Sequence, residues 1–139
     1  NCKHLNLRIM ATLFTKIING EIPCYKVAEN DKFIAFLDIN PLKKGHTLVV
    51  PKEEKDYIFR NSDEVLSEIL LFAKKVAAAL EKTIECERIG LMVLGLEVPH
   101  THIHLIPISK EGDMLLSNTR VKLTDEEYKQ LVEEIKKNM

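Results

Sequence analysis

The segment EVPHTHIHLIPI, Glu97–Ile108, restricts the fold of this chain more than any other part of the sequence. From His100 to His104 every second residue is a histidine, and a period of two is typical of a β-strand with different environments on its two faces. His100, His102 and His104 then lie in a row on one face, and Ile103 and Leu105 point to the other face or the core. The sequence therefore predicts a strand that presents three imidazoles to one side.

Three imidazoles along a strand suit an elongated ligand better than a single metal ion. At about 3.3 Å of rise per residue the outer two lie roughly 13 Å apart, whereas a Zn–N bond is only about 2 Å long. Two neighbouring histidines could still share a metal with help from His46 or Glu97, and histidines on a strand can also be surface residues without a role. Chemistry at phosphorus fits the row, because one imidazole can attack while its neighbours donate hydrogen bonds or a proton. No Walker-type glycine loop is present, which excludes a nucleoside triphosphatase of that design.

The rest of the chain is a mixture of strands and helices. Apolar residues at helical spacing predict a short helix that ends near Gly20, and Asn30-Asp31 suits a hairpin turn between two strand-forming runs. Asn61 or Ser62 can cap a long helix that runs to about Glu85. The other predicted elements are the strand His46–Val50, two strands in RIGLMVLGL and HTHIHLIPI, and a C-terminal helix opened by a capping box of Thr124 with Glu127 and a hydrophobic staple of Leu123 with Tyr128. This pattern indicates a largely antiparallel α+β domain.

Size and composition indicate one domain in a reducing compartment. The chain has 139 residues and a formal net charge of −1, so nothing global attracts a nucleic acid or an anionic membrane. No apolar run is long enough to span a membrane. Three separated cysteines argue against a disulfide framework and favour the cytoplasm. Met10 is the expected start of a single domain over residues 10–139, and residues 1–9 are interpreted as an extension or an expression remnant.

Two stretches together resemble the histidine triad, or HIT, superfamily of nucleotide-binding hydrolases and transferases. They are LFTKIINGEIPCYKVAENDKFIAFLDINPLKKGHTLVVPK and VPHTHIHLIPI, in the family's order and at a compatible distance. The resemblance implies an α+β, HIT-like fold with a five-stranded antiparallel sheet, a long helix and a C-terminal helix. It also implies a homodimer in which two sheets join into one.

The resemblance also implies roles for four histidines. His102 resembles the nucleophile that forms a nucleotidyl-histidine intermediate, and His104 the residue that contacts the phosphate and the leaving group. His100 resembles the histidine that supports its neighbours, and His46 the family's fourth histidine, which supports the triad from the adjacent strand. Hydrogen bonds from such supporting residues fix the tautomer of a nucleophilic imidazole.

The same resemblance predicts where a nucleotide binds. Asp38 matches the carboxylate that holds the ribose hydroxyls, although it could also be a turn residue before Pro41. Phe14, Ile17 and Ile39 fall where the family builds an apolar slot for the base, although apolar residues of this kind are often ordinary core. The expected ligand is a purine nucleotide or a nucleotide conjugate.

The sequence departs from the family pattern at two places. Thr12, Thr15 and Glu54 stand where many members have a Cys-x-x-Cys pair and a histidine, so we expect no zinc there and no cofactor. Leu96 and Glu97 replace a polar pair, Gln-Ser or Gln-Thr, that assists at the phosphate. Glu97 could orient a histidine or a cationic leaving group, or it could be an exposed residue without a role.

The leading hypothesis is a nucleotide hydrolase or nucleotidyltransferase. It would act at the α-phosphorus of a nucleoside 5′-phosphate derivative, such as an adenosine phosphoramidate or a dinucleoside polyphosphate. One alternative is a nucleotide-binding regulatory module with little turnover, because the polar pair is missing. Another is a small metalloprotein that uses two of the triad histidines.

Overall fold

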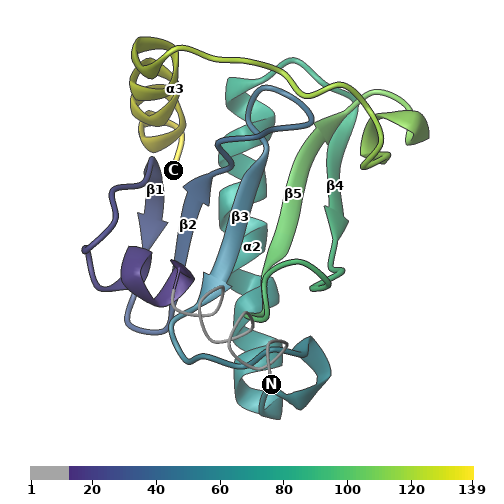
Figure 1. Cartoon of the computed structure of the whole chain (residues 1–139). Helices are drawn as coiled ribbons and strands as arrows, with labels where there is room; N and C mark the ends of the chain where they lie inside the picture. Colours follow the sequence, from purple (N-terminus) through teal and green to yellow (C-terminus); the bar gives the residue numbers. More distant parts are fainter. Residues whose placement is uncertain (1–12) are drawn as a thin grey trace.

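A computed structural model describes residues 13–139, and a single antiparallel sheet of five strands forms its centre (Figure 1). The expected extension, residues 1–9, and the expected start at Met10 lie outside the described range. The strands, in the spatial order β1-β2-β3-β5-β4, are β1 (Lys26–Glu29), β2 (Phe33–Leu37), β3 (Thr47–Pro51), β5 (Ile103–Ile108) and β4 (Arg88–Met92). The helices are α2 (Asp63–Thr83), α3 (Asp125–Lys137) and the short 3-10 helices η1 (Ile58–Arg60) and η2 (Glu111–Met114), and residues 13–18 are also helical. The predicted α+β fold with a long helix and a C-terminal helix is confirmed.

The long helix α2 begins where the sequence predicted, with Ser62 as its cap. The Ser62 hydroxyl accepts a hydrogen bond from the Val65 N–H at 3.2 Å, which satisfies one of the unpaired N–H groups of the first turn. Asn61, the other predicted cap, instead donates its amide to the Ile58 carbonyl and to the Thr101 hydroxyl, at 2.9 Å each. The helix buries one apolar stripe against the sheet: Ile69, Ala73, Val76, Ala79 and Leu80.

The C-terminal helix α3 has the predicted capping box and lies beside β1 (Figure 1). Thr124 and Glu127 exchange hydrogen bonds of 3.2 Å between side chain and backbone in both directions. Leu123 and Tyr128 both pack against the main core, as the predicted staple requires. The Tyr128 ring also stacks on Tyr25, with 4.4 Å between ring centroids, so α3 closes the β1 side of the sheet.

The two faces of the sheet carry different side chains. The face toward α2 and α3 is apolar and belongs to the larger core, with Phe33, Ala35, Leu37, Val49, Ile103 and Leu105 from the strands. The opposite face carries a smaller cluster of Ile34, Phe36, Leu48 and Val50, on which Phe14 from the first helix packs. Alternation along the strands thus separates a helix-covered face from a face that is open enough to hold a ligand.

Two strands are shorter than the sequence predicted. The strand of the histidines begins at Ile103 rather than His100, because the backbone before it leaves the ladder. The Thr101 N–H donates to the Lys55 carbonyl at 2.6 Å, and the His100 N–H donates to the Val98 carbonyl at 2.8 Å. β4 ends at Met92, so the rest of the predicted RIGLMVLGL strand is a loop.

The hairpin turn lies where the sequence predicted it. The Asn30 side chain accepts hydrogen bonds from the N–H groups of Lys32 and Phe33, at 2.9 and 2.8 Å. β1 and β2 are paired antiparallel on either side of it. None of the helices in residues 13–139 combines the length and the apolarity that crossing a membrane requires.

Candidate active site

A pocket of about 510 Å³ opens on the sheet face opposite α2. Seven of the predicted site residues lie in its wall: Phe14, Ile17, Asp38, Ile39, Glu97, His102 and His104. The other two predicted residues, His100 and His46, are almost fully buried and lie behind the wall. The pocket has the size of a typical small-molecule site, with many apolar residues and a few polar groups in its wall.

The hydrogen bond of His102 determines which of its ring nitrogens can react. Nδ1 of His102 lies 2.7 Å from the backbone oxygen of His100. A carbonyl oxygen only accepts hydrogen bonds, so Nδ1 must carry the ring proton. In the neutral ring, Nε2 of His102 then keeps its lone pair, which is the state that a nucleophilic imidazole requires.

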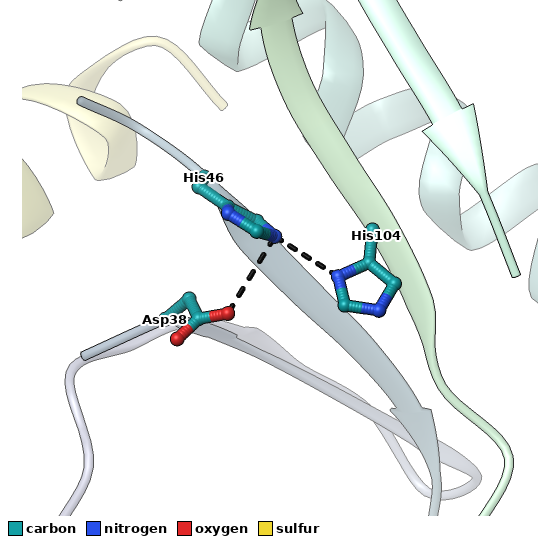
Figure 2. Close-up of side chains that lie close together, drawn as sticks. All are labelled: Asp38, His46 and His104. Atoms are coloured by element: carbon teal, nitrogen blue, oxygen red, sulfur yellow. Dashed lines mark hydrogen bonds and ion pairs between the residues drawn. The ribbon is translucent and has the colours of Figure 1, made fainter. Parts of the chain in front are cut away.

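A second chain of hydrogen bonds sets the proton on His104. The Leu42 N–H donates to Nδ1 of His46 at 3.0 Å, so the proton of the neutral His46 ring is on Nε2. Nε2 of His46 lies 3.0 Å from Nδ1 of His104 and 3.5 Å from a carboxylate oxygen of Asp38 (Figure 2). The shorter contact makes His46 a donor to His104. Nε2 of His104 then carries a proton, so His104 is a hydrogen-bond donor on the pocket side.

The rings of His102 and His104 lie side by side with complementary hydrogen-bonding states. Their centroids are 4.9 Å apart, and both rings line the pocket. One ring offers a lone pair at Nε2 and the next offers an N–H at Nε2. The pair can therefore attack one atom of a bound ligand while donating a hydrogen bond to a neighbouring atom.

His100 is buried next to the His102–His104 pair and does not line the pocket. Its Nε2 donates to the Pro51 carbonyl at 2.7 Å, which anchors the ring to the end of β3. Its Nδ1 is buried and has no hydrogen-bond partner among the described residues. Phe14 packs edge-on against both His100 and His102, at centroid distances of 5.7 and 5.4 Å. The carbonyl of His100, rather than its ring, positions the His102 side chain.

Burial keeps three of the four imidazoles neutral at pH 7. It lowers the pKa of His46 to about 4, an effect that the Asp38 carboxylate opposes. Burial, followed by the neighbouring His102 and His46, also lowers the pKa of His104 to about 4. The pKa of His100 is lowered by burial as well, against the effect of its bond to Pro51. Neutral rings are consistent with the proton positions deduced from the hydrogen bonds.

Asp38 is both a turn residue and a wall residue of the pocket. One oxygen of its carboxylate accepts from the Asn40 N–H at 2.8 Å, which is the turn role that the sequence suggested. The Tyr128 hydroxyl donates to the Asp38 backbone oxygen at 2.8 Å and so ties this residue to α3. The other carboxylate oxygen faces His46 at 3.5 Å and retains room for a further donor.

The apolar residues of the predicted base slot differ in exposure. Phe14 is buried and Ile17 half-buried, whereas Ile39 is 79% exposed at the rim. Glu97 and Leu96 also belong to the pocket wall; Glu97 is exposed and Leu96 is 92% exposed. The wall thus combines the buried ring of Phe14 with several side chains that are open to solvent.

Within residues 13–139, the group that comes nearest to a metal site is Asp38, His46 and His104, whose ligand atoms lie within 4.8 Å of one another. The hydrogen bonds do not suit an ion at this place. A metal needs the lone pair of His46 Nε2, but the Leu42 N–H occupies Nδ1 and leaves the proton of the neutral ring on Nε2. The donor set fits a hydrogen-bonded chain better than a metal site. At the other position considered, Thr15 and Glu54 offer no thiolate or imidazole, and Thr12 lies outside the described residues.

Sequence reasoning missed one charged residue of the pocket wall, Arg120. It lies in the irregular segment between η2 and α3, where no periodicity marks a residue as facing inward. Its guanidinium donates to the backbone oxygens of Asn40 at 3.0 Å and Leu116 at 3.2 Å. These bonds hold a cation beside the pocket that no motif of the sequence indicated.

A five-stranded antiparallel sheet with a row of histidines at a nucleotide-sized pocket defines the class of histidine triad proteins, and comparison with known proteins agrees. The HIT domain model matches residues 19–111. The adenosine 5′-monophosphoramidase of Schizosaccharomyces pombe is 39% identical over 129 residues, which cover 91% of this chain and 96% of that protein. The adenylylsulfatase of Arabidopsis thaliana is 32% identical over 136 residues, covering 91% of this chain and 68% of that protein.

The structural comparison gives the same result. The crystal structure of a HIT-like protein from Bartonella henselae has a TM-score of 0.79 and 30% identity, and the match covers 91% of this chain and 95% of that one. The chain therefore belongs to the HIT family. The resemblance predicted from its sequence is confirmed.

Proposed function

We propose that this protein is a nucleotide hydrolase that acts at the α-phosphorus of a nucleoside 5′-phosphate derivative through a nucleotidyl-histidine intermediate on His102. The observation that carries the proposal is the pairing of a bare Nε2 on His102 with an Nε2–H on His104 in one pocket. The names of two relatives, a monophosphoramidase and an adenylylsulfatase, support a hydrolase that cleaves an adenylyl group from nitrogen or from sulfate.

The first step transfers the nucleotidyl group to the enzyme. Nε2 of His102 attacks phosphorus with its lone pair, and the bond from phosphorus to the leaving group breaks, its electron pair going to that group. His104 donates a hydrogen bond to a phosphoryl oxygen or to the leaving atom. An anionic phosphate beside His104 favours its protonated form, which can supply the proton that a departing amine needs.

The second step returns the enzyme to its starting state. Water attacks the phosphorus of the nucleotidyl-histidine and gives up a proton to the solvent, Nε2 of His102 leaves with the electron pair, and the nucleoside monophosphate is released. The protein supplies position and hydrogen bonds in both steps, which suits a site on rigid strands. Asp38 holds the ribose, and Phe14, Ile17 and Ile39 form the base slot.

Acid-quenched mass spectrometry during turnover tests the mechanism. The substrates are adenosine and guanosine phosphoramidates and dinucleoside polyphosphates, and we expect a nucleotidyl adduct that maps to His102. An adduct on His100 or His104, or full activity in His102→Ala, contradicts the assignment.

A second candidate function is a nucleotide-binding module with little turnover. Leu96 favours it, because this side chain is 92% exposed and cannot donate a hydrogen bond to a phosphate. If the protein binds every compound of the panel but cleaves none faster than His102→Ala does, the binding module replaces the hydrolase.

We also propose that the protein is a homodimer. The outer strand β4 carries the exposed side chain of Leu91, whereas the other outer strand, β1, has α3 beside it (Figure 1). Pairing β4 with its symmetry mate would extend the sheet and cover an edge that otherwise invites aggregation. Sedimentation that shows a monomer at micromolar concentration would rule this out.

A further inference from the structure

Arg120 brings a positive charge to the His104 side of the pocket. It belongs to the segment between η2 and α3, which crosses the end of the sheet (Figure 1), and the neighbouring Val121 N–H donates to the Pro41 carbonyl at 2.9 Å. The Asn40 carbonyl that Arg120 binds lies two residues after Asp38, whose carboxylate is 3.5 Å from His46. The guanidinium is therefore anchored at the end of the histidine row where the His46–His104 pair lies.

The charge of Arg120 is not neutralised by the protein around it. Both hydrogen bonds of its guanidinium go to backbone carbonyls, and within residues 13–139 no carboxylate forms an ion pair with it. A guanidinium has five N–H donors, so several remain for a ligand. Its charge also reaches the histidines, because it contributes to the lowered pKa of both His46 and His104.

Arg120 is the positively charged side chain in a pocket wall whose other charged side chains are acidic. The two acidic side chains in its wall are those of Asp38 and Glu97, and a carboxylate repels a negatively charged ligand. Leu96, at the rim, offers no hydrogen bond. Within the described wall Arg120 is the one arginine or lysine. An anionic part of a substrate would therefore be bound best next to this residue.

We infer that Arg120 determines leaving-group specificity by binding the negative charge of an oxyanion that departs from phosphorus. This inference rests on the proposed function, because it assumes that phosphorus is attacked at His102. A leaving group such as sulfate or phosphate then lies on the His104 side, against the guanidinium. Arginine suits this role, because its planar fork binds oxyanions with two parallel hydrogen bonds.

Anionic and amine leaving groups differ in whether they need a proton to depart. When His102 attacks adenylyl sulfate, the bond between phosphorus and the bridging oxygen breaks, and sulfate departs as a dianion with the electron pair. It needs no proton, so Arg120 stabilises the developing charge and His104 is less important. Ammonia leaving from a phosphoramidate needs a proton and carries no negative charge, so there His104 matters more than Arg120.

The test compares two substrates that share the adenylyl group, adenylyl sulfate and adenosine 5′-phosphoramidate. In Arg120→Met, which keeps much of the side-chain bulk, we expect kcat/KM for adenylyl sulfate to fall roughly 10- to 100-fold, as for a lost charged hydrogen bond. The value for the phosphoramidate should change less than about 3-fold. His104→Ala should show the opposite preference. Equal losses for both substrates in Arg120→Met, or no loss for either, overturn the inference.

Two further variants separate charge from structure. Arg120→Lys keeps the charge and should retain more activity toward adenylyl sulfate than Arg120→Met does. Lys122→Ala removes a positive charge from the same segment, at a side chain outside the pocket wall, and should leave the ratio between the two substrates unchanged. A changed ratio in Lys122→Ala would show that overall charge, rather than Arg120, sets the preference.

A binding measurement keeps the inference testable even without turnover. ADP carries one phosphate more than AMP, and that phosphate occupies the leaving-group position. Calorimetry should show that the wild type prefers ADP over AMP and that Arg120→Met loses about 10-fold of this preference. An unchanged preference overturns the inference. If wild type cleaves neither substrate but the ADP preference depends on Arg120, the hydrolase proposal fails while the assignment of Arg120 to an anion stands.

Discussion

The two faces of the sheet come from the same strands but differ in what their polar and apolar groups do. On the face toward α2 and α3, Ile103 and Leu105 of β5 join a continuous apolar core. On the other face, His102 and His104 line the pocket, and their ring nitrogens are held by hydrogen bonds. Alternate residues of one short segment thus serve stability and chemistry separately. Substitutions on the pocket face should therefore change catalysis with little effect on stability, and substitutions on the core face should change stability with little effect on catalysis.

His102→Ala should have the largest effect on the pocket face. Removal of the nucleophile should lower kcat by roughly 10³-fold or more, since among residues 13–139 no other bare imidazole nitrogen lines the pocket. Affinity for AMP should stay within about 3-fold, because it comes from the base slot and Asp38. Steady-state kinetics and calorimetry with AMP check both numbers. A large loss of AMP affinity would show that His102 mainly binds the nucleotide.

Ile103→Ala, one residue further along, should have the opposite result. Ile103 is buried in the core, so its truncation should lower the free energy of unfolding by about 2–5 kcal/mol. Turnover by the folded protein should stay within about 3-fold of wild type. Urea denaturation and kinetics on the same samples measure the two quantities. If turnover of the folded Ile103→Ala protein falls as far as that of His102→Ala, the two faces are not separable.

Acid should lower the stability of the whole domain through the buried His46 on the pocket face. The pKa of His46 is lowered to about 4 in the folded protein, whereas a histidine in the unfolded chain titrates near pH 6.5. Between these values the unfolded state binds more protons, so stability is lost as pH falls from about 6.5 to about 4. The titration of His46 contributes to this loss of stability. Denaturation at several pH values in wild type and His46→Asn measures it, and parallel pH curves for the two proteins would contradict the assignment.

Asp38→Ala should have a smaller effect, confined to binding. The loss of a charged hydrogen bond to the ribose should weaken AMP binding by roughly 1–3 kcal/mol while a slower reaction persists. Asp31→Ala is the matched control, because this exposed carboxylate of the β1–β2 turn lies outside the pocket wall. Calorimetry with AMP decides between them, and equal affinities in the two variants would remove Asp38 from the ribose site.

Much of the fold could be predicted because it depends on local signals. Ser62 and the Thr124–Glu127 box open their helices through contacts within three residues, and the period of two along β5 assigns its faces. The start of β5 could not be predicted, since the Thr101 N–H leaves the ladder to bind Lys55, which is distant in the sequence. Long-range hydrogen bonds of this kind leave no periodic pattern.

The candidate site shows the same division. A family pattern indicated the histidines and Asp38, and they do lie at one pocket or directly behind it. Arg120 was missed because its position depends on a crossing segment whose carbonyl partners, Asn40 and Leu116, become neighbours only in the folded chain. The direction of the His46–His104 hydrogen bond was also beyond the sequence, because it depends on the Leu42 N–H.

The Leu42 N–H has a consequence for how the site tolerates mutation. A peptide amide keeps its proton throughout the physiological pH range, so it acts as a fixed reference that orients both rings beyond it. Any amino acid except proline supplies the same donor, so an alanine scan would pass over position 42 as a packing residue, which its buried side chain also resembles. The direction of the His46–His104 hydrogen bond is thus set by a main-chain N–H group. Among substitutions at position 42, only Leu42→Pro would erase it by removing the donor, and nitrogen-15 NMR of the His104 ring would then report a mixture of tautomers.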